Sequence, residues 1–274
     1  GPARPDDAVV SPPGRRIRLD ERLPDYSAGN TWLCLTETVR APVLAAARSF
    51  AHELGWRVAA IFYDAIPILH PEYVLDAQVR ENHASYMREL AGCDTVVPIS
   101  GFSAECLQDF WNRQGGPQTR VEVALLAGQL GETDAASLQA SQERSPTGNG
   151  RARILCVSTV EPRKNHRCLI EACIALKRRR PDLKWQLDLV GNRYAGGEEL
   201  ANHVTAACKR HPEIRWLGVV DDQTLIDLYA RADFTVYPSL IEGFGVPIVE
   251  SLAFGKPCIC SDGGVMAELA AEGG

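Results

Sequence analysis

Two acidic residues, Glu242 and Glu250, stand eight residues apart on either side of a glycine-rich turn. An apolar run at 234–238 precedes the turn and a helical pattern follows it, which predicts a strand that turns sharply into a helix. The first N–H groups of such a helix have no partner within the helix and point at whatever lies above the sheet. Gly243 and Gly245 let a ligand approach the backbone closely. The segment therefore predicts an anion site with a carboxylate on either side.

The spacing of these acids limits the chemistry. On one continuous helix they would stand roughly 12 Å apart along the axis, whereas the carboxylates of hydrolases stand about 5 to 10 Å apart. This favours two acids that contact different parts of one extended ligand. Carboxylates accept hydrogen bonds from sugar and ribose hydroxyls, and a phosphate suits the helix N-terminus. Together these features predict a nucleotide sugar as the ligand.

Two cations, Arg163 and Lys164, stand between a predicted strand and a predicted helix. Positive charge at the start of a helix opposes the helix dipole, and a diphosphate bound between the two side chains would explain their position. The alternative is a solvated basic turn in which Asn165 is the N-cap.

Several segments resemble a known family. Residues 238–257, PSLIEGFGVPIVESLAFGKP, look like the signature of the retaining glycosyltransferases of family 4, which have the GT-B fold. Residues 156–166, CVSTVEPRKNH, are similar to the phosphate-binding loop of that family, in a form closest to bacterial mannosyltransferases of surface-polysaccharide and O-antigen assembly. Residues 62–72 and 97–103 look like loops of the N-terminal domain, and the matches together span about residues 58 to 268.

The resemblance implies a role for each matching residue. Glu242 would contact the transferred sugar, Glu250 the ribose hydroxyls, and the amides of residues 244–246 the distal phosphate. Many members carry an arginine where Thr159 stands, so Arg163 would substitute for it. The predicted catalytic residues are Glu242, Arg163, Lys164 and Asp64. The predicted substrate-binding residues are Glu250, Phe244, Gly245, Val246, Gly243, Thr159, Tyr63, Gly191 and Ser103.

Simpler interpretations of these residues stay open. Glu250 also fits a first-turn acid favoured by the helix dipole, and Glu242 fits an ordinary loop acid. The turn at 244–246 also fits a role in packing alone. Tyr63, which stands where many relatives have a histidine, fits a packing residue, and Ser103 fits a helix cap.

The predicted function is transfer of a hexose, with mannose favoured, from a nucleoside-diphosphate sugar to a glycan or lipid-linked acceptor. The favoured donor is GDP-mannose, with a UDP-sugar as the alternative, and the family resemblance implies no metal or other cofactor. Two alternatives are a nucleotide-binding GT-B module without turnover and another GT-B enzyme such as a sugar-nucleotide epimerase. Nucleotide binding without product formation would favour the module.

Composition sets broad limits. The chain has 274 residues, 45% of them hydrophobic, and a formal net charge of -6, which argues against general nucleic-acid affinity. No apolar run approaches the ~20 residues needed to span a membrane, and no signal peptide is visible. We therefore expect a cytoplasmic protein, with peripheral association at the inner face of the membrane as a further option.

The order of apolar runs predicts the architecture. Strand patterns, among them 57–62 and 234–237, alternate with helix patterns, among them 72–91, on both sides of a polar segment. This alternation indicates parallel sheets with right-handed crossovers. We expect an α/β protein of the GT-B class, in which two Rossmann-like domains face a cleft and both chain ends are short for a complete enzyme. The expected units are an acceptor-side domain at 1–130, a linker at 131–152 and a nucleotide-sugar-binding domain at 153–274.

Overall fold

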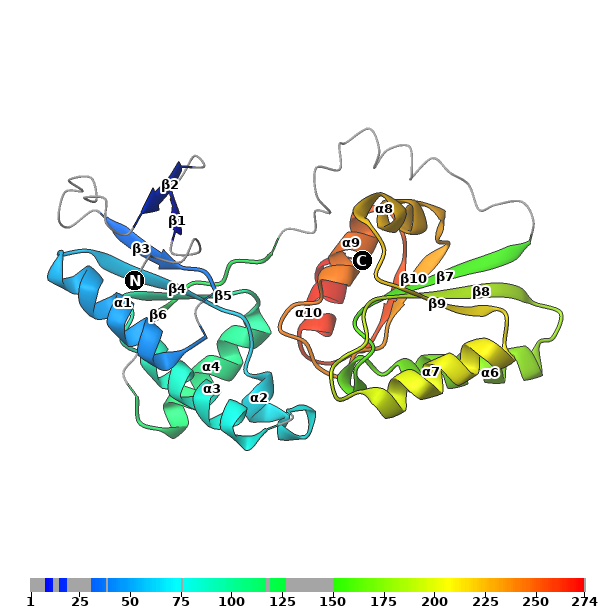
Figure 1. Ribbon diagram of the computed structural model, residues 1–274, viewed down its shortest axis with the longest axis horizontal. Coiled ribbons are helices and arrows are strands. Elements are labelled where there is room, and N and C mark those ends of the chain that lie inside the picture. The colour runs from blue at the N-terminus through cyan, green and yellow to red at the C-terminus, as the bar shows by residue number, and fades with distance from the viewer. Residues whose placement is uncertain are drawn as a thin grey trace, which may run out of the picture.

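The computed structural model describes residues 8–11, 15–18, 31–37, 39–74, 76–116, 119–126 and 150–273. These residues form two α/β units, each built around a parallel sheet (Figure 1). The boundaries expected at 130 and 152 stay a prediction: residues 127–149 lie outside the described part, and the first strand of the second unit begins at Arg151.

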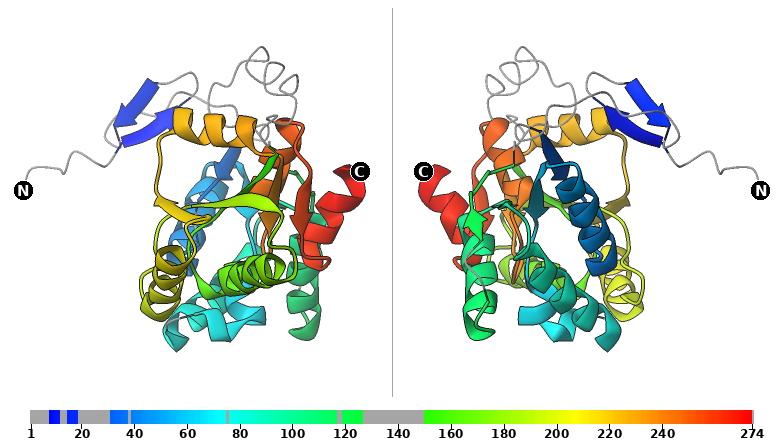
Figure 2. Two further views of the ribbon diagram at one scale, coloured as in Figure 1. Left: turned by 90° about the vertical axis from the view of Figure 1, so that its right-hand side faces the viewer. Right: turned by 90° about the vertical axis from the view of Figure 1, so that its left-hand side faces the viewer.

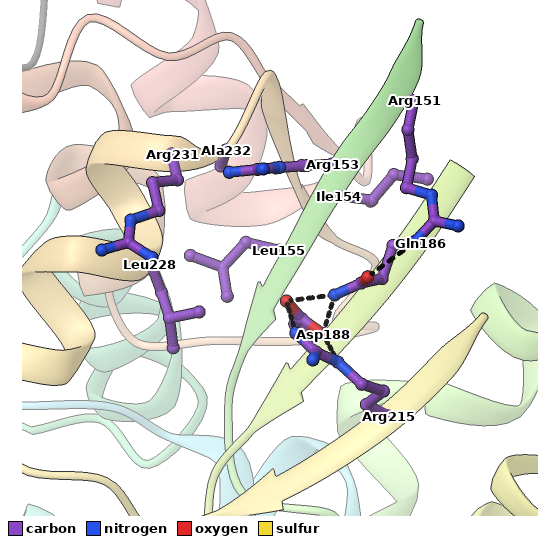
Figure 3. Close-up of a pocket in the computed structure, with 10 residues that line it drawn as sticks. All are labelled: Arg151, Arg153, Ile154, Leu155, Gln186, Asp188, Arg215, Leu228, Arg231 and Ala232. Atoms are coloured by element: carbon purple, nitrogen blue, oxygen red, sulfur yellow. Dashed lines mark hydrogen bonds and ion pairs between the residues drawn. The ribbon is translucent and has the colours of Figure 1, made fainter. Parts of the chain in front are cut away.

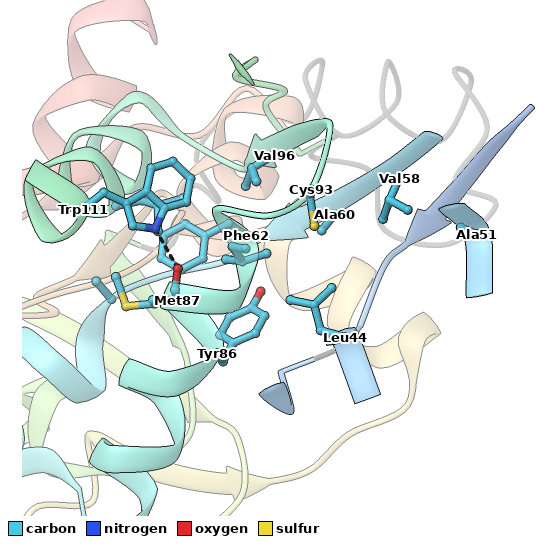
Figure 4. Packing of buried hydrophobic residues seen from close by; sticks show 13 residues of the cluster. Leu44, Ala51, Val58, Ala60, Phe62, Tyr86, Met87, Cys93, Val96 and Trp111 are labelled. Atoms are coloured by element: carbon cyan, nitrogen blue, oxygen red, sulfur yellow. Dashed lines mark hydrogen bonds between the residues drawn. The ribbon is translucent and has the colours of Figure 1, made fainter. Parts of the chain in front are cut away.

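The first unit contains a four-stranded parallel sheet in the order β3-β4-β5-β6. Its strands are β3 (Trp32–Leu35), β4 (Arg57–Phe62), β5 (Thr95–Pro98) and β6 (Arg120–Val121). Its longer helices are α1 (Ala41–Glu53), α3 (Ala77–Leu90) and α4 (Gly101–Arg113). Phe62 and Val58 of β4 pack against Leu44, Tyr86 and Trp111 from these helices to form a buried core (Figure 4).

The segment after β4 differs from the expected single helix over residues 72–91. It consists of α2 (Ile66–Leu69), a 3-10 turn η1 (Pro71–Tyr73), and then α3. Asp76 ends the irregular part because its carboxylate accepts a hydrogen bond from the N–H of Gln78 and so caps α3. The helical periodicity was present in the sequence, but this aspartate fixes the true start of the helix.

The second unit contains a five-stranded parallel sheet in the order β11-β10-β7-β8-β9. Its strands are β7 (Arg151–Val157), β8 (Lys184–Val190), β9 (Ile214–Gly218), β10 (Phe234–Tyr237) and β11 (Cys258–Cys260). The chain runs outward from β7 to β9 and then returns to the other side of β7, so the strand order reverses between β7 and β10. In open α/β sheets, ligands bind beyond the carboxyl ends of the strands at such a switch point.

Helices cover both faces of this sheet, as right-handed crossovers require. They are η2 (Pro162–Lys164), α6 (His166–Arg179), α7 (Glu198–Arg210), α8 (Asp222–Arg231), α9 (Val246–Ala253) and α10 (Gly264–Gly273). Ile170 of α6 and Val204 of α7 share a buried cluster with Leu187 of β8. Tyr229 of α8 and Phe254 share another, and their rings stack with centroids 5.2 Å apart.

The two units contact each other through α10 and the turn before α9. Helix α10 lies beside α4 of the first unit (Figure 2). Ile99, which follows β5, packs in one buried cluster with Phe244, Val265 and Met266 of the second unit. The carboxyl end of β10 therefore lies directly against the first unit.

Two further features of the fold are an antiparallel strand pair near the N-terminus and the state of the cysteines. Strands β1 (Ala8–Ser11) and β2 (Arg15–Arg18) pair antiparallel in a segment for which no strands were predicted. All nine cysteines are free thiols.

Candidate functional site

Three charged side chains meet at the switch point of the second sheet. Arg163 and Lys164 follow β7, and Glu242 follows β10. The Nζ atom of Lys164 lies 2.5 Å from Oε1 of Glu242, and Nη1 of Arg163 lies 2.6 Å from Oε2. One carboxylate thus binds both cations that the sequence assigned to a diphosphate.

Neighbouring groups hold this cluster in place. Lys164 also donates to the hydroxyl of Tyr237 at 2.8 Å, and Ser239 donates to Oε1 of Glu242. The N–H of Leu240 donates to the carbonyl of Arg163 at 2.7 Å, which joins the two loops through their backbones. The arrangement is preorganised by backbone and side-chain contacts alike.

Burial makes the charges of the cluster interdependent. Lys164 and Glu242 are 9% and 7% exposed, respectively. Burial would raise the pKa of Glu242, but Lys164 and Arg163 outweigh it and hold that pKa below its usual range. Burial lowers the pKa of Lys164 despite the attraction of Glu242. Arg163 also pairs with Glu161 at 2.8 Å, so a ligand that draws Glu242 away must supply negative charge to Lys164 above all.

The backbone after Lys164 is strained. Asn165 has φ 56° and ψ 34°, a left-handed conformation that non-glycine residues adopt infrequently, and its side chain forms no cap hydrogen bond. It separates η2 from α6. The alternative was a solvated basic turn with Asn165 as the N-cap. Asn165 does occupy the N-cap position of α6, but without a side-chain hydrogen bond, and Lys164 is buried rather than solvated.

His166 begins α6 and is fully buried. Its Nε2 lies 3.3 Å from Oγ of Ser158. Burial, followed by the nearby charge of Lys164, lowers its pKa to about 4, so the ring is neutral at pH 7.

Glu250 lies on α9, and its hydrogen-bond partner is not one of the three charged residues Arg163, Lys164 and Glu242. Its Oε2 accepts a hydrogen bond from the hydroxyl of Tyr229 at 2.7 Å. The residue is 7% exposed, and burial raises its pKa. The two acids of the motif therefore occupy different environments, one between cations and one beside a neutral phenol.

The start of α9 has open hydrogen-bonding capacity. Gly245 precedes the helix with φ 112°, a left-handed conformation suited to glycine, and no side chain caps the helix. Val246 is the first helical residue and Phe244 is buried in the cluster between the two units. The glycine conformation that the sequence indicated is thus present at Gly245.

The first unit meets this turn at Gly243. A Cβ atom at Gly243 would lie 2.5 Å from the carbonyl oxygen of Tyr63 and 2.9 Å from Cβ of Asp64. The hydroxyls of Ser100 and Ser103 donate to the Gly243 carbonyl at 2.8 and 3.1 Å. Only a glycine fits this contact between units.

Two predicted residues of the first unit have local partners. The carboxylate of Asp64 accepts from the N–H of Ile66 at 2.9 Å, at the start of α2. The hydroxyl of Tyr63 donates to the carbonyl of Thr36. Both residues border the Gly243 turn through their backbone and Cβ atoms, while these hydrogen bonds direct their polar ends elsewhere.

Sequence reasoning missed Glu268 of α10. Its two carboxylate oxygens accept hydrogen bonds from the N–H groups of Gly101 and Phe102, each at 2.9 Å. These are the first amides of α4, so a residue of one unit caps a helix of the other. No local pattern around Glu268 could have revealed this partner, which lies more than 160 residues away in the chain.

Gly191 and Thr159 lie together beside the carboxyl end of β7. Gly191 has φ 142°, and a Cβ there would lie 2.1 Å from the carbonyl oxygen of Ser158 and 3.0 Å from the N of Thr159. Thr159 is half-buried. The close approach explains the glycine in structural terms.

Within the described residues, no group of three His, Cys, Asp or Glu side chains could hold a metal ion. The helices of this same part of the chain are all too short or too polar to cross a membrane. A cavity of about 360 Å³ lies beside Pro162, His166 and Leu200, next to the loop that carries the two cations.

Residues 139–274 match the model of a family described as glycosyl transferases group 1. The match covers the carboxy-terminal part of the chain, which contains the second sheet. A relative from Escherichia coli, O-antigen chain mannosyltransferase B, is 29% identical over 219 residues, which are 80% of this chain and 56% of the relative. The chain thus spans little more than half the length of that relative.

Solved glycosyl transferase structures have the same fold. An UDP-forming alpha,alpha-trehalose-phosphate synthase from Burkholderia xenovorans superposes with a TM-score of 0.67 at 14% identity, over 86% of this chain and 60% of that one. Anabaena Alr3699/HepE, solved in complex with UDP and glucose, gives a TM-score of 0.61 at 19% identity over the same 86% of this chain and 60% of its own. These likenesses and the two parallel sheets confirm the predicted GT-B fold class.

Proposed function

We propose that this group 1 glycosyl transferase is a retaining hexosyltransferase that moves mannose from a nucleoside-diphosphate sugar to a glycan or lipid-linked acceptor. The observation that carries the proposal is the meeting of Lys164, Arg163 and Glu242 at the switch point of the second sheet, beside an uncapped helix start. A site with two cations and an open helix N-terminus suits a diphosphate.

Each charged group then has a defined task. Lys164 and Arg163 stabilise the negative charge that grows on the departing nucleoside diphosphate. Glu242, released from the two cations by the incoming phosphates, orients the hexose. The bond between the anomeric carbon and the phosphate oxygen breaks as the acceptor hydroxyl attacks on the same face, and the acceptor proton passes to the leaving phosphate.

The remaining predicted residues would position the donor. Glu250 would accept hydrogen bonds from the ribose hydroxyls, which requires an opening beside its Tyr229 contact. Gly245 and Val246 would offer backbone N–H groups to the distal phosphate. Asp64 and Tyr63 would approach the hexose from the first unit, which already touches the turn at Gly243.

The identity of the donor rests on the relatives. The name of the Escherichia coli relative specifies mannose, which favours GDP-mannose. One of the two solved structures is a complex with UDP and glucose and the other is a UDP-forming synthase, which keeps a UDP-sugar as the alternative. We place the reaction on the cytoplasmic side of the membrane, where nucleotide sugars would be available.

The test is binding of GDP, UDP and ADP, measured by calorimetry and by the shift of the unfolding temperature. Wild type is compared with Lys164→Ala and Glu250→Ala, and with the matched surface controls Lys209→Ala and Glu81→Ala. We expect selective binding of one diphosphate that is lost in the first two variants and kept in the controls.

Equal binding in all five proteins would overturn the assigned site. Selective diphosphate binding without product, in a chain extended to the full length of its relatives and supplied with donor and acceptor, would instead favour the nucleotide-binding module without turnover.

A further inference from the structure

A second basic region lies on the same sheet, at the opposite end from the switch point. Here a cavity of about 260 Å³ is lined by four arginines, Arg151, Arg153, Arg215 and Arg231. Asp188 contributes the cavity's one carboxylate among its described lining residues. We call this cavity the arginine pocket (Figure 3).

The strand register explains why the arginines converge. Residues two apart on a strand share a face, so Arg151, Arg153 and the apolar Leu155 of β7 lie on the same side of the sheet. Arg153 is directly opposite Gln186 of β8, and Asp188 is opposite Arg215 of β9.

Helix α8 crosses this face and closes the far side of the pocket. Its last residue, Arg231, lies there beside Leu228. Figure 3 shows the Arg153 side chain extending from β7 toward Ala232 at the end of α8. The result is a polar rim of guanidinium groups over a floor that includes Leu155 and Leu228.

The carboxylates nearby satisfy only part of this positive charge. Arg215 forms a two-point contact with Asp188, at 2.7 and 2.8 Å. Arg231 pairs with Asp227 at 3.2 Å on the exposed surface of α8. Asp233 is occupied by the backbone N–H of Arg153, at 2.7 Å. The guanidinium of Arg153 has no partner among the residues that the structure describes, so the pocket keeps an excess of positive charge.

We propose that the arginine pocket is a second anion site, which binds a phosphate monoester or diester through Arg153 and Arg231. Guanidinium groups present fixed forks of N–H donors that match phosphate oxygens. Like charges held around one concave site repel one another, and an anion relieves that repulsion. The apolar floor suits the carbon part of the ester.

This site is distinct from the proposed donor site. It lies at the amino ends of β7, β8 and β9, whereas Lys164 and Glu242 lie beyond the carboxyl ends of β7 and β10. A phosphate here would come from a soluble phosphorylated sugar or from the headgroup of an anionic lipid. Both present the same tetrahedral anion, so the experiment must separate the two sources.

The test uses two probes with one set of variants. Glucose 6-phosphate is titrated by calorimetry, and co-sedimentation is measured with phosphatidylglycerol vesicles and with neutral phosphatidylcholine vesicles. The pocket variants are Arg153→Gln and Arg231→Gln, singly and together, and the control of equal charge change is Arg120→Gln, whose side chain is 70% exposed in the first unit. Arg231 is itself 55% exposed, so its substitution leaves the fold intact.

Loss of about one charge-assisted hydrogen bond should weaken binding about tenfold in each single variant, with the control unchanged. Such a loss with glucose 6-phosphate assigns a soluble ester, and such a loss with anionic vesicles alone assigns a lipid headgroup. The proposal is overturned if neither probe binds, or if binding is the same in the pocket variants as in Arg120→Gln. Diphosphate binding at the donor site should persist in every pocket variant, which keeps the two proposals separable.

Discussion

Two clusters of basic side chains lie on one sheet, but their positive charges are compensated in different ways. At the switch point, Lys164 and Arg163 are largely buried and both pair with Glu242, and Arg163 also pairs with Glu161 at 2.8 Å. In the arginine pocket, the guanidinium groups stay partly solvated and a single lining carboxylate, Asp188, pairs with Arg215 alone.

The difference follows from where each cluster lies. The switch point is covered by the first unit, which contacts the turn at Gly243, so an unpaired charge there would be costly. The amino ends of β7 to β9 have no such cover in the described structure, and water can solvate the arginines. Buried cations therefore need a carboxylate from the protein, whereas solvent-exposed cations are stabilised by water and can bind an anionic ligand.

The strongest test of this contrast removes one carboxylate from each cluster. Glu242→Gln leaves the buried Lys164 without a counter-charge, while Arg163 keeps its pair with Glu161. This change should lower the free energy of unfolding by about 3–5 kcal/mol. Asp188→Asn frees Arg215, whose side chain is 49% exposed, and should cost about 1 kcal/mol or less. Urea denaturation of both variants checks the ranking, and equal losses would remove the distinction.

The buried cluster should also respond to pH where the arginine pocket does not. His166 has a folded-state pKa of about 4, below its unfolded value near 6.5, so the unfolded chain binds the extra proton. Stability is therefore complete above pH about 6.5 and falls by roughly 1.4 kcal/mol per unit as the pH drops toward 4.

Guanidinium groups keep their charge throughout this range, and the lowered pKa of Glu242 places its own contribution at more acidic pH. Unfolding measured at intervals between pH 7 and 4 in wild type and His166→Gln tests the assignment. The slope should be smaller in His166→Gln, where the contribution of His83 remains because burial lowers the pKa of that histidine too. The slope should be unchanged in the control His211→Gln; an unchanged slope in His166→Gln would assign it to another group.

The cover over the switch point can be tested at Gly243. Gly243→Ala places a methyl group 2.5 Å from the carbonyl of Tyr63, and relieving that overlap should cost about 1–3 kcal/mol. Gly263→Ala is the matched control, because a Cβ there meets nothing within 4 Å. Faster hydrogen exchange at the amides of Gly101 and Phe102 in Gly243→Ala alone would show that the units separate; equal exchange in both variants would contradict the contact.

The sequence predicted the repeating parts of the fold more fully than the contacts between units. Alternation of apolar runs located β4 and β10 to the residue, because each strand is bounded by a change of pattern. The start of α3 was misplaced because one side-chain cap, at Asp76, decides it. The hairpin of β1 and β2 was missed because its segment is polar and rich in proline.

The site was predicted in its residue types but not in its partnerships. The motif around Glu242 and the pair Arg163 and Lys164 pointed to one site, and the structure brings these three together. The sequence did not indicate that Glu242 would bind both cations. The contact of Glu268 with α4 and the arginine pocket both depend on residues from separate elements, so no local spacing predicts them.

The smallest expected effect concerns Arg153, and it decides whether the arginine pocket is structural. Because this guanidinium has no partner in the described structure, Arg153→Gln should change the free energy of unfolding by less than about 0.5 kcal/mol. Any change should be a gain at low salt, since one of four like charges is removed, and the gain should shrink as salt screens the rest. Urea denaturation at low and high ionic strength measures both. A salt-independent loss as large as that of Glu242→Gln would mean that Arg153 stabilises the sheet, and the two clusters would then differ only in exposure. A neutral result would show that the charge of Arg153 does not stabilise the fold, as expected of a group that binds a ligand.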